Sequence, residues 1–182
     1  MGRHSREILP GGYFHCINRG VGRREIFHEQ RDYETFVHLM RRSQKKYPVN
    51  ISAYSIMPNH WHIVLSAESG KHLARFFSSL LNSHTRWYHA KYKSIGHGPI
   101  YQGRYKSIPL PEEAVHSVCR YVERNPIAAH LVADAGDWPW SSHGFWTGKL
   151  NTYGPVLSRP FVEDATQWAK VVGSDPINIY NN

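Results

Sequence analysis

Apolar residues recur at helical spacing in two long stretches of the chain and predict two amphipathic helices, over residues 30–46 and 71–92. The apolar face of the first stretch consists of Tyr33, Phe36, Val37 and Met40. A third helix is expected over residues 111–125. A proline and two acidic residues open this stretch, and Pro126 disfavours helical geometry in the residue before it.

Segments rich in β-branched and aromatic residues predict four strands, over residues 13–18, 49–57, 60–67 and 100–110. Pro58 and Asn59 form a tight-turn signal between the second and third strands, which therefore read as a hairpin. The order strand, helix, strand, strand, helix, strand, helix is the split βαβ pattern of ferredoxin-like folds. The predicted fold class is α+β, an antiparallel sheet with helices packed on one face. A short last helix is expected within residues 161–172.

The composition indicates one folded domain. Of the 182 residues, 41% are hydrophobic and 20% are charged, which is typical of globular chains. We expect a domain over residues 1–149, including a basic N-terminal leader, and a C-terminal tail over residues 150–182. No apolar run approaches the ~18 residues of a membrane span, and the leader lacks the apolar segment of a signal peptide. Two cysteines cannot build a disulfide framework, so a cytoplasmic location without a membrane partner is expected.

The charge changes this picture most. The chain carries 22 Lys and Arg against 14 Asp and Glu, a formal net charge of +8, which favours a polyanionic partner. Six Trp, eleven Tyr and seven Phe add rings on which unpaired bases can stack. Thirteen histidines direct attention to metal binding or acid–base chemistry.

Two residue pairs form a candidate site. His60 and His62 are two apart on a predicted strand, so their rings point to the same face and can share a cation. Tyr121 and Asn125 are four apart on a predicted helix and share a face, where the amide oxygen can complete a metal site beside the phenol. Taken separately, each pair is also compatible with a structural role: histidines on a polar sheet face, a core tyrosine and a helix-ending asparagine.

Several motifs resemble, in the correct order, those of the single-tyrosine HUH transposases, and most closely those of the REP-associated tyrosine transposases. They span about residues 12–143. The motifs are Asn18-Arg19-Gly20 followed by Arg23-Arg24-Glu25-Ile26-Phe27, Met57-Pro58-Asn59-His60-Trp61-His62-Ile63-Val64-Leu65, Tyr101-Gln102-Gly103-Arg104-Tyr105-Lys106-Ser107, Tyr121-Val122-Glu123-Arg124-Asn125-Pro126 and Asp137-Trp138-Pro139-Trp140-Ser141-Ser142.

This resemblance implies a mechanism. Tyr121 would attack a backbone phosphate of single-stranded DNA, leaving a 5′-phosphotyrosyl link and a free 3′-OH. A divalent metal, Mg²⁺ or Mn²⁺, would be held by His60, His62 and Asn125, although insertion-sequence relatives commonly have glutamine at the Asn125 position. The chemistry of these ligands alone permits zinc or manganese and does not favour magnesium. No general base stands out, since Glu123 is expected to face away from Tyr121.

The resemblance also implies a DNA partner, single-stranded or in a palindromic hairpin, and a bacterial-type, nucleoid-associated location. A monomer is favoured, and a dimer with exchanged helices is the alternative. Cations would position phosphates and rings would stack bases. Each arginine can also be an ordinary solvated charge. The candidate DNA-binding residues are Arg3, Arg6, Arg19, Arg23, Arg24, Arg75, Arg86, Tyr101, Gln102, Arg104, Tyr105 and Lys106.

Two other functions compete with this interpretation. A non-catalytic protein that binds hairpin nucleic acid would use the same basic surface while its histidines stay structural. A zinc hydrolase acting on a small substrate would use the histidines but would not need the basic surface. Formation of a covalent DNA adduct separates the transposase from both.

Overall fold

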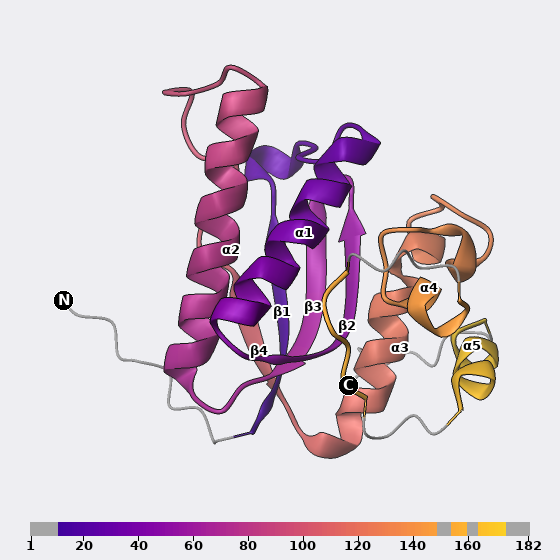
Figure 1. Cartoon of the computed structure of the whole chain (residues 1–182). Coiled ribbons are helices and arrows are strands. Elements are labelled where there is room, and N and C mark those ends of the chain that lie inside the picture. Colours follow the sequence, from indigo (N-terminus) through magenta and orange to yellow (C-terminus); the bar gives the residue numbers. More distant parts are fainter. Residues whose placement is uncertain (1–10, 149–153, 160–163, 174–182) are drawn as a thin grey trace.

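The computed structural model describes residues 11–148, 154–159 and 164–173. Four strands form one antiparallel sheet in the order β2-β3-β1-β4 (Figure 1). This is the order that a split βαβ fold requires. The strands are β1 (Tyr13–Arg19), β2 (Asn50–Met57), β3 (His60–Ser66) and β4 (Lys106–Leu110). The predicted α+β class and the predicted order of elements are confirmed.

Two long helices, α1 (Gln30–Lys46) and α2 (Gly70–Lys91), pack side by side on one face of the sheet (Figure 1). Their apolar stripes and the alternate residues of the strands enclose the larger core. Among the largest fully buried side chains there are Trp61, Phe36 and Phe77. This face therefore supplies most of the hydrophobic stabilisation.

The opposite face carries α3 (Glu112–Ala128), which contacts β2 most and β3 and β1 less. A second core lies here, where Ala53 and Val64 of the strands meet Val115 and Val122 of α3. The expectation of helices on one face thus holds for α1 and α2, whereas α3 covers the other face. Strand order alone does not say on which side a helix that follows the last strand will pack.

Two predicted boundaries differ from the structure. Helix α3 continues past Asn125 to Ala128 with Pro126 inside it, because proline removes a single hydrogen bond and the last turn is closed by the Ala129 amide donating to the Asn125 carbonyl. Strand β4 begins at Lys106 rather than at residue 100. The segment before it bends, since the Asn18 side chain and the β1 backbone bind its backbone.

The C-terminal part folds onto the same body. Leu157 bridges to Ile51 of β2 and Ser141 bridges to Ser55, so both segments lie along the edge of the sheet. The predicted last helix is present as α5 (Ala165–Gly173), which packs on α3, and its expected start at residues 161–163 lies outside the described residues. Shorter elements are η1 (Val21–Arg23), η2 (Ala135–Asp137) and α4 (His143–Trp146). Within the described ranges no helix has the length and apolar character to cross a membrane.

Candidate active site

His60 and His62 project from β3 toward the face that α3 partly covers. The register pairs His60 with Arg19 and His62 with Ile17 of β1, and directly paired residues share a face. Trp61 points the other way into the core and is fully buried. The side-chain alternation expected from the sequence therefore sets the direction of both imidazoles.

The turn that starts β3 is held by the loop that follows β1. The Gly20 amide donates to the Asn59 carbonyl at 2.8 Å, and the Asn59 side-chain amide donates to the Arg23 carbonyl at 3.0 Å. The Ile26 amide donates to the Pro58 carbonyl at 2.8 Å. These bonds fix the backbone from which His60 projects, so the first sequence motif and the histidine motif form one local structure.

Hydrogen bonds also select the nitrogen that each imidazole presents. His60 Nδ1 lies 2.6 Å from Asn59 Oδ1, which can only accept, so Nδ1 carries the proton and Nε2 has a free lone pair. His62 Nδ1 lies 2.9 Å from His15 Nε2. With His62 as the donor of that bond, its Nε2 is also unprotonated. This orientation by a second hydrogen-bonding group is usual for metal-binding histidines.

All three imidazoles favour the neutral form. Burial lowers the pKa of His15 to about 4, and burial together with the Arg19 charge lowers the pKa of His60 to about 4. The pKa of His62 falls well below its usual value, first through burial and then through His15, His60 and Arg19. Because a metal ion binds the neutral imidazole, His60 and His62 are ready ligands at neutral pH without losing a proton.

Tyr121 of α3 lies directly against this group. Its ring centroid is 6.0 Å from that of His62 and 6.2 Å from that of His15, in edge-on contacts at 88° and 77°. Asn125, one turn later, donates from Nδ2 to the Tyr121 carbonyl at 3.0 Å, which leaves Oδ1 as the side-chain atom able to accept or to ligate. The phenol expected from the sequence is thus brought next to the histidine pair.

The donor set fits a divalent cation with open coordination positions. The two imidazole nitrogens would provide two neutral ligands, and the amide oxygen of Asn125, one turn after Tyr121, would be the third. In the described ranges no cluster of three His, Cys, Asp or Glu side chains forms a metal site, so a cation here would need the Asn125 oxygen or ligands from the substrate.

Comparisons with known proteins identify the family of this chain. The family model of IS200-like transposases matches residues 10–125. The chain belongs to this family. A comparison with curated protein sequences found no match. Among solved structures, the transposase is similar to a REP-associated tyrosine transposase bound to a REP hairpin, with 17% identity over 90% of this chain and 96% of that one and a TM-score of 0.60, a likeness of fold. A candidate transposase from Deinococcus radiodurans R1 matches at 16% identity over 68% of this chain and 97% of that one, with a TM-score of 0.47. The family model and the first of these two structures confirm the suspected family.

His15 is the member of the site that the sequence did not reveal. It is 1% exposed, and the register places it on the same face as His62 but two pairs further along β1. Its contact with His62 depends on how β1 and β3 align, which local patterns do not encode. Side-chain alternation within residues 13–18 was the one sequence feature that could have indicated His15, because it points His15 and Ile17 to the same face of the sheet.

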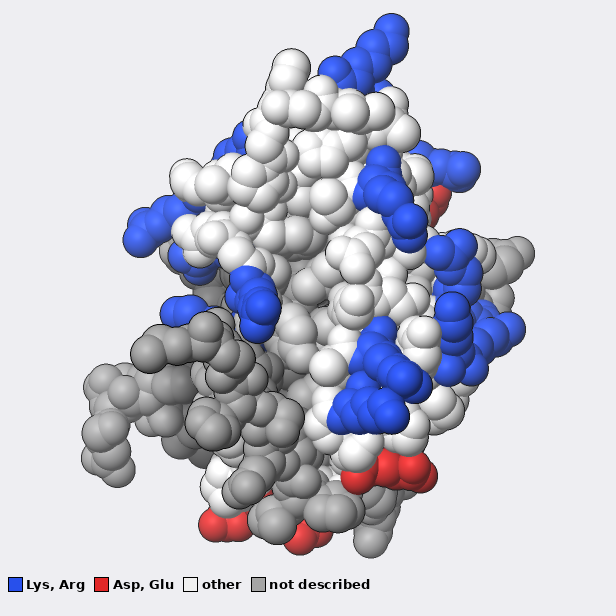
Figure 2. Space-filling view, turned by 90° about the vertical axis from the view of Figure 1, so that its left-hand side faces the viewer, with Lys and Arg blue, Asp and Glu red and all other residues white. Residues whose placement is uncertain are grey.

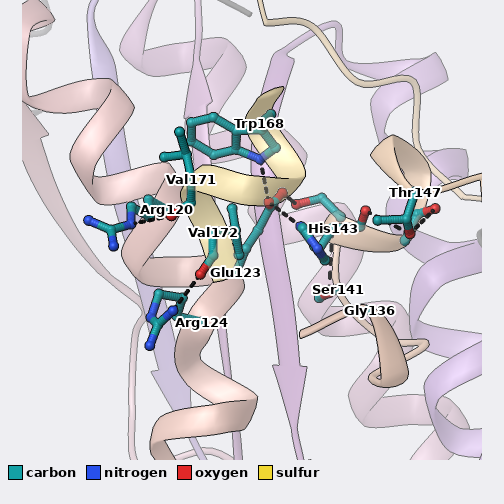
Figure 3. Close-up of polar contacts among 12 residues, drawn as sticks. Arg120, Glu123, Arg124, Gly136, Ser141, His143, Thr147, Trp168, Val171 and Val172 are labelled. Carbon is teal, nitrogen blue, oxygen red and sulfur yellow. Dashed lines mark hydrogen bonds and ion pairs between the residues drawn. The ribbon is translucent and has the colours of Figure 1, made fainter. Parts of the chain in front are cut away.

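Glu123 of the transposase faces away from Tyr121, as expected. Its carboxylate is fully buried and accepts a hydrogen bond from Trp168 Nε1 of α5 at 2.7 Å, while His143 Nδ1 lies 3.3 Å away (Figure 3). Arg159 and Ser142 also donate to this carboxylate. These partners lower its pKa against the effect of burial, with Arg159 the largest favourable influence. Glu123 therefore joins α3 to the C-terminal segment and is not a base for Tyr121.

The DNA-binding candidates fall into three groups. Arg3 and Arg6 lie outside the described residues. Arg19 and Lys106 stand on the histidine face, because the register pairs them with His60 and, through Ile17, with His62. The others lie elsewhere on the surface or in the core. Exposed side chains are those of Arg23, Arg24, Arg75, Arg86, Gln102 and Arg104.

Tyr101 and Tyr105 are less accessible than the exposed candidates. Tyr101 is 7% exposed and its hydroxyl lies 2.7 Å from Nδ1 of the buried His84. It is a core residue, so the expectation that Tyr101 stacks on a base is wrong for this structure. Tyr105 is partly buried and stacks on Phe77 with ring centroids 4.1 Å apart, so one of its ring faces is already covered.

Proposed function

We propose that this transposase cleaves single-stranded DNA beside a hairpin through Tyr121 and then transfers the strand. The observation that carries the proposal is the position of the Tyr121 ring, 6.0 Å from the His62 ring on the sheet face that also bears His60. The hairpin in the structure of the similar REP-associated transposase supports this class of target. A single copy of the chain brings these groups together, so the proposal favours a monomer.

The proposed reaction exchanges one phosphodiester for another. The Tyr121 oxygen attacks the phosphorus and its proton passes to solvent. The bond to the 3′ oxygen breaks, and that oxygen keeps the electron pair and takes up a proton to become a 3′-OH. The DNA is then linked through its 5′ phosphate to Tyr121. Attack of a 3′-OH on this link reverses the chemistry and joins strands.

His60, His62 and Asn125 would hold Mg²⁺ or Mn²⁺ in this proposal. A bound cation supplies stabilisation of the negative charge that develops on the phosphate, as well as polarisation of its oxygens. The chain's own contribution is orientation. His15 and Asn59 fix the imidazoles, and α3 presents Tyr121 from the side.

Cations on the same face would hold the substrate. Arg19 lies beside His60 on the neighbouring strand β1, and Lys106 lies one strand further on β4, so both can contact backbone phosphates on one side of the histidine pair. Their charges add to that of a metal ion and favour a phosphate over a neutral substrate.

The test is incubation of the full chain with Mn²⁺ and a labelled hairpin oligonucleotide that has a single-stranded flank, followed by denaturing gel analysis. The wild type should give a denaturation-resistant adduct, and Tyr121→Phe should give none while keeping its affinity for the DNA. Tyr13→Phe is the matched control, since Tyr13 lies on the same sheet face and should not be needed.

Absence of any adduct in the wild type, with hairpin binding intact, would replace this function with that of a non-catalytic nucleic-acid binder. An adduct in Tyr121→Phe would assign the nucleophile to another residue.

A further inference from the structure

Asp32 and Glu123 are the two fully buried carboxylates among the described residues. Most other charged side chains lie at the surface, and Figure 2 shows a face on which Lys and Arg are spread with few acidic side chains among them. A buried charge costs free energy, and a buried ion pair is often no more stable than a well-packed apolar pair of the same volume. Stability alone therefore does not account for a carboxylate at position 123.

Glu123 and Tyr121 lie on opposite sides of the same helix. At 3.6 residues per turn, two positions along α3 correspond to about 200° around the helix axis. Tyr121 points to the histidine pair, with its ring centroid 6.0 Å from that of His62, and Glu123 points to the C-terminal segment. A contact that fixes the Glu123 side chain therefore also sets the direction of the phenol.

The Glu123 carboxylate is tied to the sheet through Arg159. Arg159 donates from Nη2 to this carboxylate and from Nε to the Ser52 carbonyl, next to Ala53 of β2. The guanidinium carbon lies 4.6 Å from the centroid of the nearest Trp146 ring and 4.7 Å from that of Trp168. One immobilised cation thus joins the helix of Tyr121 to the strand that pairs with the histidine strand β3.

Two further contacts restrain α3 next to Tyr121. Arg120 donates from Nε to the Val171 carbonyl at 2.8 Å, and Arg124 donates to the Val172 carbonyl (Figure 3). Both arginines lie within three residues of the tyrosine, one on each side of it in the chain. Movement of α3 along its axis is restrained by these bonds, while its rotation is restrained by Glu123.

The contacts of α3 with the sheet cannot supply the same precision. They are made by apolar side chains, among them Val115 and Val122 of α3 with Ala53 and Val64 of the strands. Burial of apolar surface is favourable but not directional. Attack on a phosphate requires the reacting atoms within about 3–3.5 Å and in line, and a misplacement of about 1 Å can lower the rate by about 100-fold.

We propose that Glu123 and Arg159 are positioning residues for Tyr121, and that their buried ion pair sets the rotation of α3 which aims the phenol at a phosphate beside the histidine pair. The inference rests on the proposed function, because Tyr121 is the nucleophile only there. It gives Arg159 and α5 a supporting part in the reaction, although neither contacts the reacting atoms.

The experiment compares full-length wild type, Glu123→Gln and Glu123→Leu/Arg159→Met. It measures the rate of adduct formation with Mn²⁺ at a saturating concentration of a hairpin oligonucleotide that has a single-stranded flank. The dissociation constant of the same DNA is measured in EDTA, and stability is measured by urea denaturation. Asp32→Asn is the matched control, because it removes the charge of the other buried carboxylate, which pairs with Lys91 at the start of α1.

Glu123→Gln and the double variant should form the adduct at least about tenfold more slowly at saturating DNA, because misplacement of the phenol affects the attack. Their dissociation constants for DNA should stay as in the wild type. Asp32→Asn should lose stability and react at the wild-type rate. The double variant should regain stability relative to Arg159→Met without regaining the rate, which a purely structural ion pair would not produce.

A double variant or Glu123→Gln that reacts as fast as the wild type overturns the inference. Equal slowing in Asp32→Asn also overturns it, since the rate would then follow stability alone. These outcomes leave the proposed function intact. A wild type that forms no adduct contradicts the proposed function itself, and the positioning role falls with it.

Discussion

At the scale of single residues, two hydrogen bonds decide what the histidine pair can do. Asn59 and His15 each engage one Nδ1 atom, which leaves the Nε2 atoms of His60 and His62 as the nitrogens able to bind a cation. Side-chain alternation along residues 60–67 predicted the shared face of the pair. The hydrogen bond between His15 and His62 depends on the register of β1 and β3 and was not predictable from the local sequence.

His15→Leu should weaken binding of Mn²⁺ by about 10- to 100-fold, because His62 loses the partner that fixes its ring and tautomer. Titration calorimetry measures this affinity directly. His15→Gln should retain more affinity, since its amide oxygen can accept from His62 Nδ1. His38→Ala, on the exposed side of α1, is the control and should bind Mn²⁺ as the wild type does. Equal affinity in His15→Leu and the wild type would show that His15 does not position His62.

Gly20 is required for a steric reason. A Cβ atom at this position would lie 2.3 Å from the Arg24 carbonyl oxygen and 2.9 Å from Ile26 Cγ2. Gly20→Ala should therefore lower the free energy of unfolding by roughly 1–3 kcal/mol, as expected for a clash that the backbone must relieve. Urea denaturation tests this. Gly103→Ala is the matched control, since its Cβ would meet nothing within 4 Å; similar losses in both variants would contradict the steric explanation.

At the scale of elements, α3 is held between the sheet and the C-terminal segment. Arg120 and Arg124 donate to the carbonyls of Val171 and Val172 near the C-terminal end of α5, where cations also suit the helix dipole (Figure 3). Glu123 adds the buried contacts from the same helix. Tyr121 therefore projects from a helix that is fixed on both sides.

The sequence predicted the bounds of α1 and came within a residue or two at most strand ends, because apolar periodicity and turn residues are local signals. It did not predict that α3 continues past Pro126. The preference of the residue before a proline for extended geometry was outweighed by the hydrogen bonds of the last helical turn. The contact of Glu123 with Arg159 was also not predictable, because these residues are 36 apart and no local pattern joins them.

Arg159→Met should destabilise the protein by about 3–5 kcal/mol, because it leaves the buried Glu123 carboxylate without its cation. Urea denaturation of both variants measures the effect. The double variant Glu123→Leu/Arg159→Met should lose less than Arg159→Met alone, since no buried charge remains. If the double variant loses as much stability as Arg159→Met and Glu123→Leu lose when added together, the two residues are not coupled.

At the scale of the whole molecule, the two faces of one sheet are built differently. The larger core lies on the side of α1 and α2, and the histidine pair lies on the side of α3. The split βαβ order was predictable because it depends only on the sequence of elements. The two-sided cover was not, because the side on which α3 packs depends on the apolar contacts of Ala53 and Val64.

Acidification should destabilise the fold through its buried histidines. The pKa of His15 and His60 is lowered to about 4 and that of His84 to about 3, chiefly by burial, whereas an unfolded chain protonates histidine near 6.5. Between these values the unfolded chain binds more protons, so stability is fully present above about pH 6.5 and decreases as the pH falls toward 4. The urea midpoint should be lower at about pH 5 than at about pH 7. A higher midpoint at the lower pH would contradict the neutral state of these side chains.

The two edge strands of the sheet, β2 and β4, also determine whether copies of this protein can pair their sheets. Strand β4 is short, bears an exposed Lys106 and contains Pro109, a residue confined to edge strands because it has no backbone N–H to donate. At the other margin, the bridges from Ser141 and Leu157 occupy β2. In the described residues, neither margin offers a long, flat row of unpaired amides and carbonyls, so the edges of the sheet are protected from pairing with those of other copies.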